Sequence, residues 1–496
     1  MESAPTRERR CWMAGFLFFA ALLIFNLAYH SMWGDELQAW GIARASSDPV
    51  ELFENLRYEG HPMLWHLVLW PASQWTGDPR AMQAIHASLA LAWLALVWFR
   101  SPFTLAERIL LSSSHYLVYE YAVVSRCYGL GVLLMFLFVV WRQDFSRRPW
   151  AGWLLLGLLA NTQMFLALAA LSLGGLWLWI ERSRGRDVLS GISIFVLLLA
   201  FAGVTMARGN VSTTLQTRPV VVFTDALDTF CDAFAPLEDP RNGRYWKPGM
   251  ERVPSLVAGA LVLGLIVLYL RRQPAGLLAF FFLVGSMTVF FCIRYHGSSW
   301  HGGIAFVTLV SLVWLLRDDG RRLGPVWAFW LILALNLAGG LKSVVASKHR
   351  PLSTSREAAR WIHEHELQDE FWIAYPAFPG FGAGTYLDRP VYFPEAHTEG
   401  RYVRWGEHEL FRIWDLPGEV ERLLALRELE RVHLITNYDL LNGRWRPPHE
   451  LDRRFHVVEL ARFRNADDDL ERFILYRVER RDSLSVPAGN VPGTAQ

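Results

Sequence analysis

Long apolar runs separated by short basic loops dominate the first two thirds of the chain. Most of these runs approach the roughly 20 residues that a helix needs to cross the apolar core of a bilayer. The pattern therefore predicts a polytopic α-helical membrane protein with about eleven spans. The predicted spans cover residues 12–28, 81–99, 104–124, 126–142, 150–163, 164–181, 188–207, 254–271, 275–293, 299–316 and 323–341.

One further apolar segment, HPMLWHLVLWPASQW at residues 61–75, is short and is interrupted by Pro71. If it crossed the membrane, every later basic loop would change sides. We therefore expect an interfacial or half-inserted helix here, within a first outer loop that covers residues 29–80.

The basic residues orient the spans, because cytoplasmic loops of membrane proteins carry an excess of Lys and Arg. These clusters alternate consistently if the N-terminus is cytoplasmic and residues 342–496 lie on the outer side. The run 12–28 is long for a signal peptide, and no A-x-A-like cleavage site follows it, so we expect it to be retained as a span. The clusters are residues 7–10, Arg100 with Arg108, and residues 142–148, 181–186, 271–272 and 317–322.

Two polar regions interrupt this pattern. The loop 208–253 is expected on the outer side, with a short amphipathic stretch near 222–235. Beyond the membrane domain, residues 1–345, the composition changes sharply. Residues 350–480 alternate predicted helices with predicted strands, which indicates a small α/β extracytoplasmic domain. The tail 481–496 has the composition of a disordered terminus.

The predicted elements of this domain are short. Helices are expected at 355–366 and near 418–430. Strands are expected at 371–375, 432–436, 455–460 and 472–478.

Composition supports the membrane interpretation and excludes some partners. Of the 496 residues, 52% are hydrophobic and 19% are charged, against about 25% charged in average soluble chains. The net charge of +2 and the lack of a basic arm give no reason to expect a nucleic-acid partner. The four cysteines form neither a disulfide framework nor a CxxC metal motif, and Cys231 is expected in the long polar loop.

The sequence SMWGDELQAW, residues 31–40, follows the first span and contains two adjacent acids, Asp35 and Glu36. On a helix, neighbouring side chains diverge by about 100°. One of these acids can therefore face a cavity while the other forms a pair or caps the helix. An aspartate at this place is also explained by helix capping alone.

Other polar residues gather at the predicted outer turns. Charged groups at membrane depth usually face a cavity or a partner. Together with the acid pair they make a candidate site at the outer membrane face. The residues are Glu59, His61, Arg80, Glu120, Arg126, Tyr128, Asn161, Tyr295 and His301.

Each of these residues also has a structural explanation. Arg80 alone would be explained by a side chain that extends to the head groups, and Tyr128 by the aromatic belt at the interface. His301 alone would be explained as a packed, hydrogen-bonded histidine. Glu59 and His61, separated by Gly60, could bind a divalent metal or orient the acid pair. Two ligands are too few to define a metal site, so a structural role is favoured.

The chemistry that this combination favours involves an anion and a carboxylate base. Arg80 and Arg126 could hold a phosphate through forked hydrogen bonds. Asp35 could take a proton from an acceptor hydroxyl or position that hydroxyl.

These residues stand in sequence motifs that resemble the GT-C class, polytopic glycosyltransferases that use polyprenyl-phosphate sugars. The motifs are WGDELQAW, EGHPMLWHLVLW and GDPRAMQAIHASLAL, with YEYAVVSRCYGLGVLLMF and PLSTSREAARWIHEHE further along the chain. The nearest branches are the aminoarabinose transferase and protein O-mannosyltransferase superfamily and the Rgt-like domain. The resemblance covers roughly residues 10–400. It departs from the family at HPM, where HPP is common, and at Trp300, where an arginine is expected.

The resemblance implies an enzyme of the bacterial inner membrane. It would transfer a sugar from a polyprenyl-phosphate donor to a lipid, glycan or protein acceptor on the outer face. Asp35 would activate or position the acceptor, accompanied by Glu36. Arg80 and Arg126 would lie near the donor phosphate, and we add Tyr128 and His61 to that group. Membrane lipids are expected partners, the C-terminal domain would help to recognise the acceptor, and no cofactor is required beyond a possible divalent metal.

Two other functions are compatible with a polytopic chain of this kind. A transporter or flippase of a lipid-linked sugar would be favoured by inverted repeats and broken helices at mid-membrane; the sequence contains no such repeat, and the short pair within 150–181 is the only hint of a broken helix. A non-catalytic partner in cell-envelope polysaccharide assembly would be favoured by degenerate acids, whereas Asp35 and Glu36 are both present.

Overall fold

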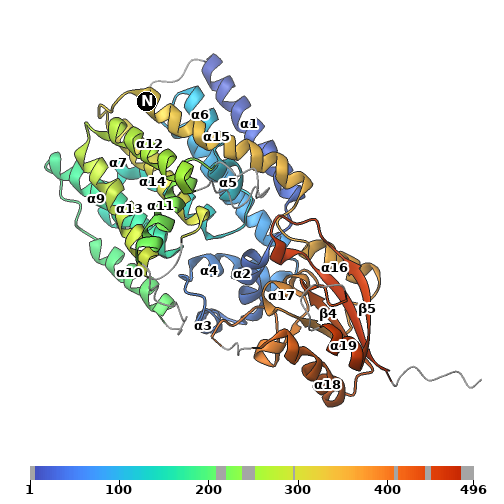
Figure 1. The fold of residues 1–496 in the computed structure, drawn as a ribbon. Helices are drawn as coiled ribbons and strands as arrows, with labels where there is room; N and C mark the ends of the chain where they lie inside the picture. Colours follow the sequence, from blue (N-terminus) through green and yellow to red (C-terminus); the bar gives the residue numbers. More distant parts are fainter. Residues whose placement is uncertain are drawn as a thin grey trace, which may run out of the picture. The chain divides into compact units, whose positions relative to one another are not determined.

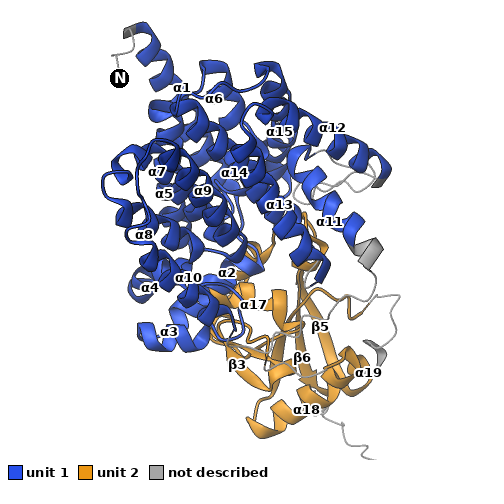
Figure 2. Cartoon of the chain, turned by 90° about the vertical axis from the view of Figure 1, so that its left-hand side faces the viewer, with its two compact units in different colours: residues 1–352 blue, residues 353–496 orange. Residues whose placement is uncertain are grey.

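The computed structural model describes residues 6–207, 219–236, 252–293, 297–406, 411–441 and 448–481. The chain divides into two compact units, residues 1–352 and residues 353–496 (Figure 2). The first unit is almost entirely helical, and the second contains a sheet with helices, as Figure 1 shows. The mostly helical fold with a small C-terminal α/β region therefore agrees with the sequence-based expectation.

The helices of the first unit follow the apolar runs closely. In chain order they are α1 (Thr6–Tyr29), α2 (Gly34–Ala45), α3 (Pro49–Asn55), α4 (Leu64–Trp75), α5 (Arg80–Arg100), α6 (Leu105–Ser112), the π-helix η1 (Tyr116–Glu120), α7 (Cys127–Phe145), α8 (Pro149–Ala160), α9 (Met164–Ser183), α10 (Ile192–Ala207), α11 (Pro219–Phe234), α12 (Arg252–Leu270), α13 (Pro274–Ile293), α14 (Ser299–Asp318) and α15 (Val326–His349).

Within the described residues, eight helices are long and apolar enough to cross a membrane: α1, α5, α7, α9, α12, α13, α14 and α15. Eight of the eleven predicted spans are therefore supported by the length and composition of their helices. Two of the other predicted spans form apolar helices that are shorter, the 12-residue α8 and the 16-residue α10. The third, residues 104–124, is not one helix.

The segment 104–124 is broken because its middle, SSSHY, is polar. α6 begins with a capping box, in which the Thr104 amide donates to Glu107 Oε2 at 2.9 Å and the Glu107 amide donates to Thr104 Oγ1 at 3.3 Å. After α6 ends at Ser112, the chain continues as η1. The whole segment runs along α14: Glu107 accepts from both terminal nitrogens of Arg317 at 2.7–2.8 Å. At the other end, the Tyr116 hydroxyl donates to the Ser299 carbonyl at 2.9 Å.

α14 forms the centre of the first unit. Every residue from Trp300 to Leu316 is buried, and the helix packs against α7, α9, α11 and α13. Close packing is possible because glycines stand at the contacts. A Cβ at Gly303 would lie 2.1 Å from the Tyr116 ring, and one at Gly302 would lie 2.5 Å from the Thr229 carbonyl of α11.

α4 is the helix predicted not to cross the membrane. Its 12 residues span about 18 Å at the usual rise per residue, well short of the roughly 30 Å apolar core of a bilayer. It packs against α2 and α5 (Figure 1). The amphipathic stretch predicted near 222–235 is α11, and Cys231 is on this helix and not in a polar loop.

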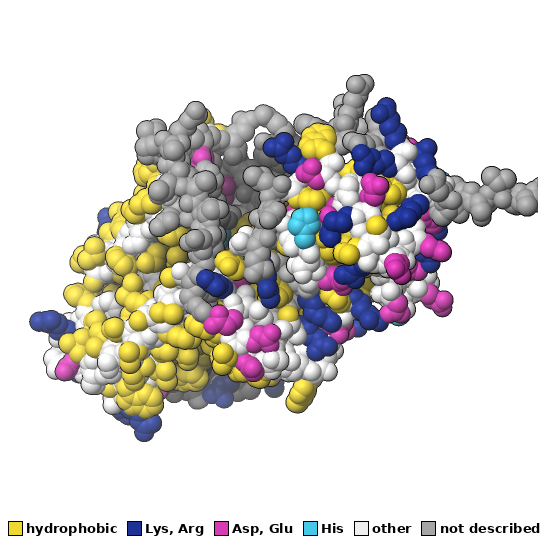
Figure 3. All heavy atoms as spheres, turned by 90° about the horizontal axis from the view of Figure 1, so that it is seen from below, with side chains coloured by type: hydrophobic (Ala, Val, Ile, Leu, Met, Phe, Trp, Pro, Cys, Tyr) yellow, Lys and Arg dark blue, Asp and Glu magenta, His cyan; other side chains and the backbone are white. Residues whose placement is uncertain are grey.

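The outward faces of the long helices are apolar. Leu278 of α13 is 72% exposed and Leu197 of α10 is 71% exposed. In Figure 3 hydrophobic side chains gather over the helical unit, whereas charged side chains are prominent on the C-terminal unit. Exposed apolar side chains on several long apolar helices are typical of a membrane protein.

The C-terminal unit contains one six-stranded mixed sheet with the order β3-β2-β1-β4-β6-β5. β1 is parallel to β2 and β4, and the other neighbouring strands are antiparallel. The strands are β1 (Trp372–Ala374), β2 (Val391–Phe393), β3 (Thr398–Gly400), β4 (Arg431–Thr436), β5 (Phe455–Arg462) and β6 (Ile474–Arg480). The helices are α16 (Ser355–Glu364), α17 (Ala377–Tyr386), α18 (Leu416–Leu426) and α19 (Pro448–Arg454), with short 3-10 turns η2 (Pro394–Ala396), η3 (Ile413–Asp415) and η4 (Asp469–Glu471).

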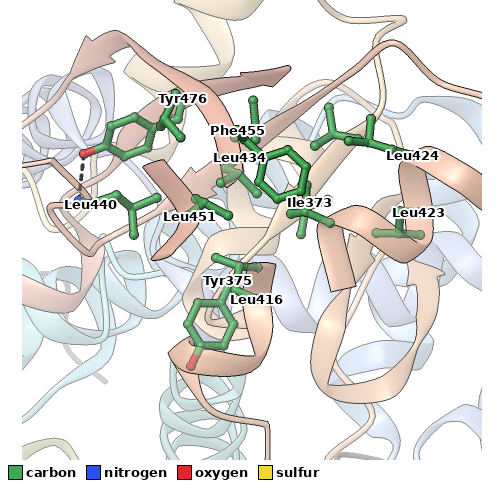
Figure 4. Packing of buried hydrophobic residues seen from close by; sticks show 14 of the residues in the cluster. Ile373, Tyr375, Leu416, Leu423, Leu424, Leu434, Leu440, Leu451, Phe455 and Tyr476 are labelled. Carbon is green, nitrogen blue, oxygen red and sulfur yellow. Dashed lines mark hydrogen bonds between the residues drawn. The ribbon is translucent and has the colours of Figure 1, made fainter. Parts of the chain in front are cut away.

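The core of this unit lies between the sheet and α18 (Figure 4). Leu423 and Leu424 of α18 pack with Ile373 and Leu434 of the central strands. The Tyr476 hydroxyl in β6 accepts a hydrogen bond from the Leu440 amide at 3.1 Å. The predicted strands and the two predicted helices of the domain are present, so the α/β expectation is confirmed. Of the predicted disordered tail, residues 481–496, all but Arg481 lie outside the described residues.

Candidate functional site

The two adjacent acids occupy the first turn of α2 and have different surroundings. The Asp35 side chain is 33% exposed, whereas Glu36 is fully buried. This is the divergence expected from helical periodicity. Only Asp35 remains open to a substrate, so the two acids cannot have the same task.

Glu36 joins three parts of the first unit. Its carboxylate accepts from His30 Nε2 at 2.9 and 3.0 Å, from the Trp33 amide at 3.2 Å and from the Ser125 amide at 2.6 Å. Through these bonds it caps α2 and holds the end of α1 and the residue before Arg126. These contacts make Glu36 a positioning residue, and they satisfy its buried carboxyl oxygens.

Asp35 forms an ion pair with Arg126. The distance between Arg126 Nη2 and Asp35 Oδ2 is 3.0 Å. Arg126 immediately precedes α7 and is 8% exposed. The pair therefore joins the beginning of α2 to the beginning of α7, which are 91 positions apart in the chain.

Aromatic rings surround the Arg126 guanidinium. Its central carbon lies 5.6 Å from the centre of the Trp33 ring, 5.1 Å from that of Tyr128 and 5.7 Å from that of Trp300. Rings at this distance attract a cation through their π faces. Tyr128 is in turn stacked on Tyr121, with ring centres 5.2 Å apart. We call Asp35, Arg126 and these three rings, Trp33, Tyr128 and Trp300, the Asp35–Arg126 site.

Arg126 stays charged although it is buried. Burial acts against the charge, but Tyr128 and the acids Asp35 and Glu120 raise the pKa of the guanidinium above its ordinary value. Its second terminal nitrogen, Nη1, is buried without a hydrogen-bond partner among the described residues. A donor left this way costs about 1–3 kcal/mol. An oxygen of an anionic ligand would satisfy it.

Glu59 lies beside the pair. Its Oε1 accepts a hydrogen bond from the Gln38 side chain at 2.7 Å. Burial is the main cause that raises the Glu59 pKa to about 8, and the charge of Asp35 raises it further, against the opposing effect of the Gln38 bond. At neutral pH this carboxyl is therefore protonated, and Asp35 keeps a neutral neighbour.

The histidine of the HP motif is also near Arg126. Burial and the Arg126 charge lower the His61 pKa to about 4. His66, in the first turn of α4, has its pKa lowered to about 3 by burial and by His61. Both rings are neutral at physiological pH, and the Nδ1 atoms of both are buried without a hydrogen-bond partner among the described residues. Neutral imidazoles of this kind can accept or donate a hydrogen bond to a ligand.

Two further predicted residues, His301 and Glu120, lie next to the Asp35–Arg126 site. The Ser298 amide donates to His301 Nδ1 at 3.3 Å, so the histidine caps its own helix, α14. Its ring meets Tyr128 edge to face, with ring centres 6.3 Å apart. Glu120 ends η1, is 3% exposed, and contributes negative charge to the surroundings of Arg126.

Two predicted site residues have other surroundings. Arg80 is 71% exposed and pairs with Asp78 at 2.6 Å, at the beginning of α5. Asn161 directly follows α8, and its side-chain amide donates to the carbonyls of Gly157 and Leu198 at 2.8 Å each. The contacts of Asn161 hold α8 to α10. Tyr295 lies outside the described residues.

The structure adds residues that sequence reasoning did not select. Gln38, Trp33 and Trp300 contact members of the site, and His30 holds Glu36. Gln38 and Glu36 flank Leu37 on α2, in the motif WGDELQAW, whose acids Asp35 and Glu36 are the predicted site residues. In the sequence, Trp300 is only a departure from the GT-C pattern. No sequence pattern shows that these residues lie close together, because α2 and α14 are distant in the sequence.

The sequence allows Glu59 and His61 to bind a divalent metal. Among the residues that the structure describes, no group of three His, Cys, Asp or Glu side chains is arranged to hold a metal ion. The Glu59 carboxyl bonds to Gln38 instead. The divalent metal stays a sequence-based hypothesis.

Comparisons of the chain with known protein families, with curated proteins and with solved structures find no match.

Proposed function

We propose that this protein is a membrane glycosyltransferase that moves a sugar from a polyprenyl-phosphate donor to an acceptor hydroxyl or amine. The observation that carries this proposal is the Asp35–Arg126 ion pair, in which a partly exposed carboxylate meets a buried guanidinium with a free donor. The GT-C resemblance of the motifs around both residues supplies the donor class.

In the proposed reaction the acceptor oxygen attacks the anomeric carbon while Asp35 takes its proton. The bond between the anomeric carbon and the phosphate oxygen breaks, and its electron pair leaves with the polyprenyl phosphate. A single displacement inverts the configuration at the anomeric carbon. A positioned base contributes typically 10²–10⁴-fold to such a step.

Arg126 would hold the leaving phosphate. Its Nη2 keeps the ion pair with Asp35 at 3.0 Å, while Nη1 is available to a phosphate oxygen. One planar guanidinium would then fix both reacting partners, which a lysine ammonium cannot do in the same geometry. The charge that builds on the phosphate as the bond breaks would be stabilised more strongly than that of the bound donor.

We further propose eleven crossings: the eight long helices, α8, α10 and the broken segment α6–η1. Crossing by α6–η1 is supported by its contacts with both ends of α14. With a cytoplasmic N-terminus, this topology would put the Asp35–Arg126 site and the C-terminal unit on the outer face, and the GT-C resemblance implies a bacterial inner membrane. A membrane-impermeant maleimide should label a cysteine at Glu54 but not at Asp144 in intact cells; labelling of both, with a permeant reagent as control, would reject this topology.

The donor class is tested with membranes that contain the purified, reconstituted chain. A panel of radiolabelled polyprenyl-phosphate sugars is compared with the corresponding nucleotide sugars, in the presence of envelope extracts as acceptor. We expect label in a new glycosidic linkage from at least one lipid-linked sugar and none from the nucleotide sugars.

Two results would contradict the proposal. Transfer from nucleotide sugars alone would show that the proposed donor class, polyprenyl-phosphate sugars, is wrong. Label that crosses the bilayer without forming a new glycosidic bond would make the protein a carrier of lipid-linked sugars, and Asp35 would then belong to a gate.

A further inference from the structure

A second polar feature lies at the other end of the helical unit, where α9 ends and the loop to α10 begins. A cavity of about 600 Å³ opens there, and its lining includes Trp179, Arg182, Arg186 and Asp187. The Trp179 side chain is 41% exposed. The guanidinium of Arg321 lies over its ring, 5.1 Å from the ring centre.

A second cavity of about 530 Å³ adjoins the first and is apolar. It lies between α9 and α13, with Leu171, Gly175, Leu278 and Phe282 in its lining. Trp179 lines both cavities, so an apolar groove along the helices leads to a basic pocket at their end. A Cβ added at Gly175 would meet nothing within 4 Å, which shows that the groove is open there.

The arginines around the pocket differ in their partners. Arg142 and Arg184 pair with Asp319 at 3.3 and 2.5 Å, and Arg186 pairs with Glu181 at 3.2 Å. Asp187 accepts from the Leu189 amide at 2.9 Å. Among the described residues, Arg182 has no ion pair or side-chain hydrogen bond. It is the cation of this pocket whose charge is uncompensated.

The pocket and the Asp35–Arg126 site are at opposite ends of the same helices. Arg126 and Tyr128 are at the beginning of α7, whereas Arg142, near its end, pairs with Asp319 beside the pocket loop. The 19 residues of α7 extend about 28 Å, close to the thickness of the apolar core of a bilayer. The pocket therefore belongs to the opposite membrane face.

We propose that the joined cavities bind one anionic glycerophospholipid from the leaflet opposite to the Asp35–Arg126 site. The phosphate would meet Arg182, with Arg186 beside it. One acyl chain would lie in the groove over Gly175. Trp179 would stand at the boundary between head group and chain, where tryptophan is enriched in membrane proteins. An inorganic phosphate would use only the basic half of this site. This assignment does not depend on the transfer reaction.

The test measures lipid retention by the purified full chain in detergent, with native mass spectrometry and added phosphatidylglycerol or phosphatidylcholine. We expect one tightly held phosphatidylglycerol. Arg182→Ala should weaken it about tenfold, and the matched control Arg147→Ala, an exposed arginine of the loop after α7, should not. Gly175→Phe should exclude it by filling the groove, whereas Gly264→Phe, on the open face of α12, should not.

Equal retention of both lipids, or unchanged phosphatidylglycerol binding in Arg182→Ala, would overturn the proposal. Loss of lipid in Arg147→Ala to the same extent would also overturn it, because the attraction would then be general to basic loops. If Gly175→Phe does not fold, the comparison of Arg182→Ala with Arg147→Ala alone decides. Added inorganic phosphate at millimolar concentration should not displace the lipid. Full displacement would mean that the site binds only the phosphate group, and would reject the proposal that an acyl chain lies in the groove.

Discussion

At the scale of residues, the sequence predicts that the two acids of α2 diverge but not which of them is buried. The helical repeat separates the side chains of Asp35 and Glu36, and this divergence follows from the local sequence alone. The burial of Glu36 depends on the Ser125 amide, a partner 89 residues away. Arg80 and Arg126 are likewise equivalent in the sequence. Their surroundings differ because Arg80 finds Asp78 two positions earlier, whereas Arg126 is enclosed by rings from three segments.

This difference gives a prediction about the two arginines. Arg126→Lys keeps a positive charge but cannot hold Asp35 and a phosphate through two fixed nitrogens. We expect transfer to fall about 10²-fold, by analogy with the removal of a transition-state donor. Arg80→Lys, the matched control at an exposed position, should change the rate less than about threefold, because exposed ion pairs contribute little. Initial rates in reconstituted vesicles check both. Equal losses in the two variants would show that the ion pair with Asp35 does not distinguish Arg126.

Glu59 gives a prediction about stability against pH. Its pKa is about 8 in the folded chain, against 4.5 as the ordinary value. The folded pKa is the higher one, so protonated Glu59 contributes to the free energy of unfolding. This contribution is complete below about pH 4.5 and is lost as the pH rises to about 8. Within this window the loss is at most about 1.4 kcal/mol per pH unit.

Glu59→Gln cannot ionise and keeps an oxygen for the Gln38 amide. We expect the variant to match the wild type in thermal unfolding at pH 4.5 and to unfold at a higher temperature at pH 8. The measurement is a series of unfolding curves in detergent from pH 4.5 to 8.5. Parallel curves for the two proteins would mean that Glu59 ionises normally in the folded chain.

At the scale of elements, hydrophobic runs predict the ends of most long helices to within about three residues, but α1 begins at Thr6 and α15 continues to His349, beyond the predicted runs 12–28 and 323–341. The run 104–124 is not one helix. Its average composition is that of a span, but the three serines at 112–114 favour hydrogen bonds with nearby backbone groups over a regular helix. α17 was not expected, since AFPGFGAGTY contains three glycines and a proline, which have low helix propensity. Its kink at Phe378 shows how the chain accommodates them.

The contact between η1 and α14 gives a prediction about stability. In Gly303→Ala the new methyl group would lie 2.1 Å from the fully buried Tyr116 ring. We expect a loss of about 1–3 kcal/mol, the usual cost of overpacking. Gly285→Ala on α13 is the control. Its methyl group meets nothing within 4 Å, so stability should stay or rise by up to about 1 kcal/mol.

Thermal unfolding of the two alanine variants in the same detergent decides between these expectations. Similar unfolding temperatures for both would indicate that η1 can move away from α14 without cost. The Tyr116 hydrogen bond to Ser299 would then contribute little to the fold.

At the scale of the whole molecule, composition separates the helical unit from the α/β unit, because exposed apolar and exposed charged faces need different residues. Composition does not predict which residues come together in the candidate site. Asp35, Glu59, Arg126 and His301 come from four separate segments, and only the packing of α2, α7 and α14 brings them together. Sequence motifs could select these residues as polar groups at outer turns, but not show that Arg126 pairs with Asp35 or that Arg80 pairs with Asp78.

The central claim is that Asp35 takes the acceptor proton in a transfer reaction. The most direct test is the initial rate of sugar transfer by reconstituted Asp35→Asn, with Glu54→Gln as a control acid on the exposed face of α3. Asparagine has the same shape and can still accept a hydrogen bond from Arg126, but it cannot take a proton. We expect transfer to fall at least about 10²-fold in Asp35→Asn and to be unchanged in Glu54→Gln. Wild-type rates in a correctly folded Asp35→Asn protein would contradict the proposed mechanism.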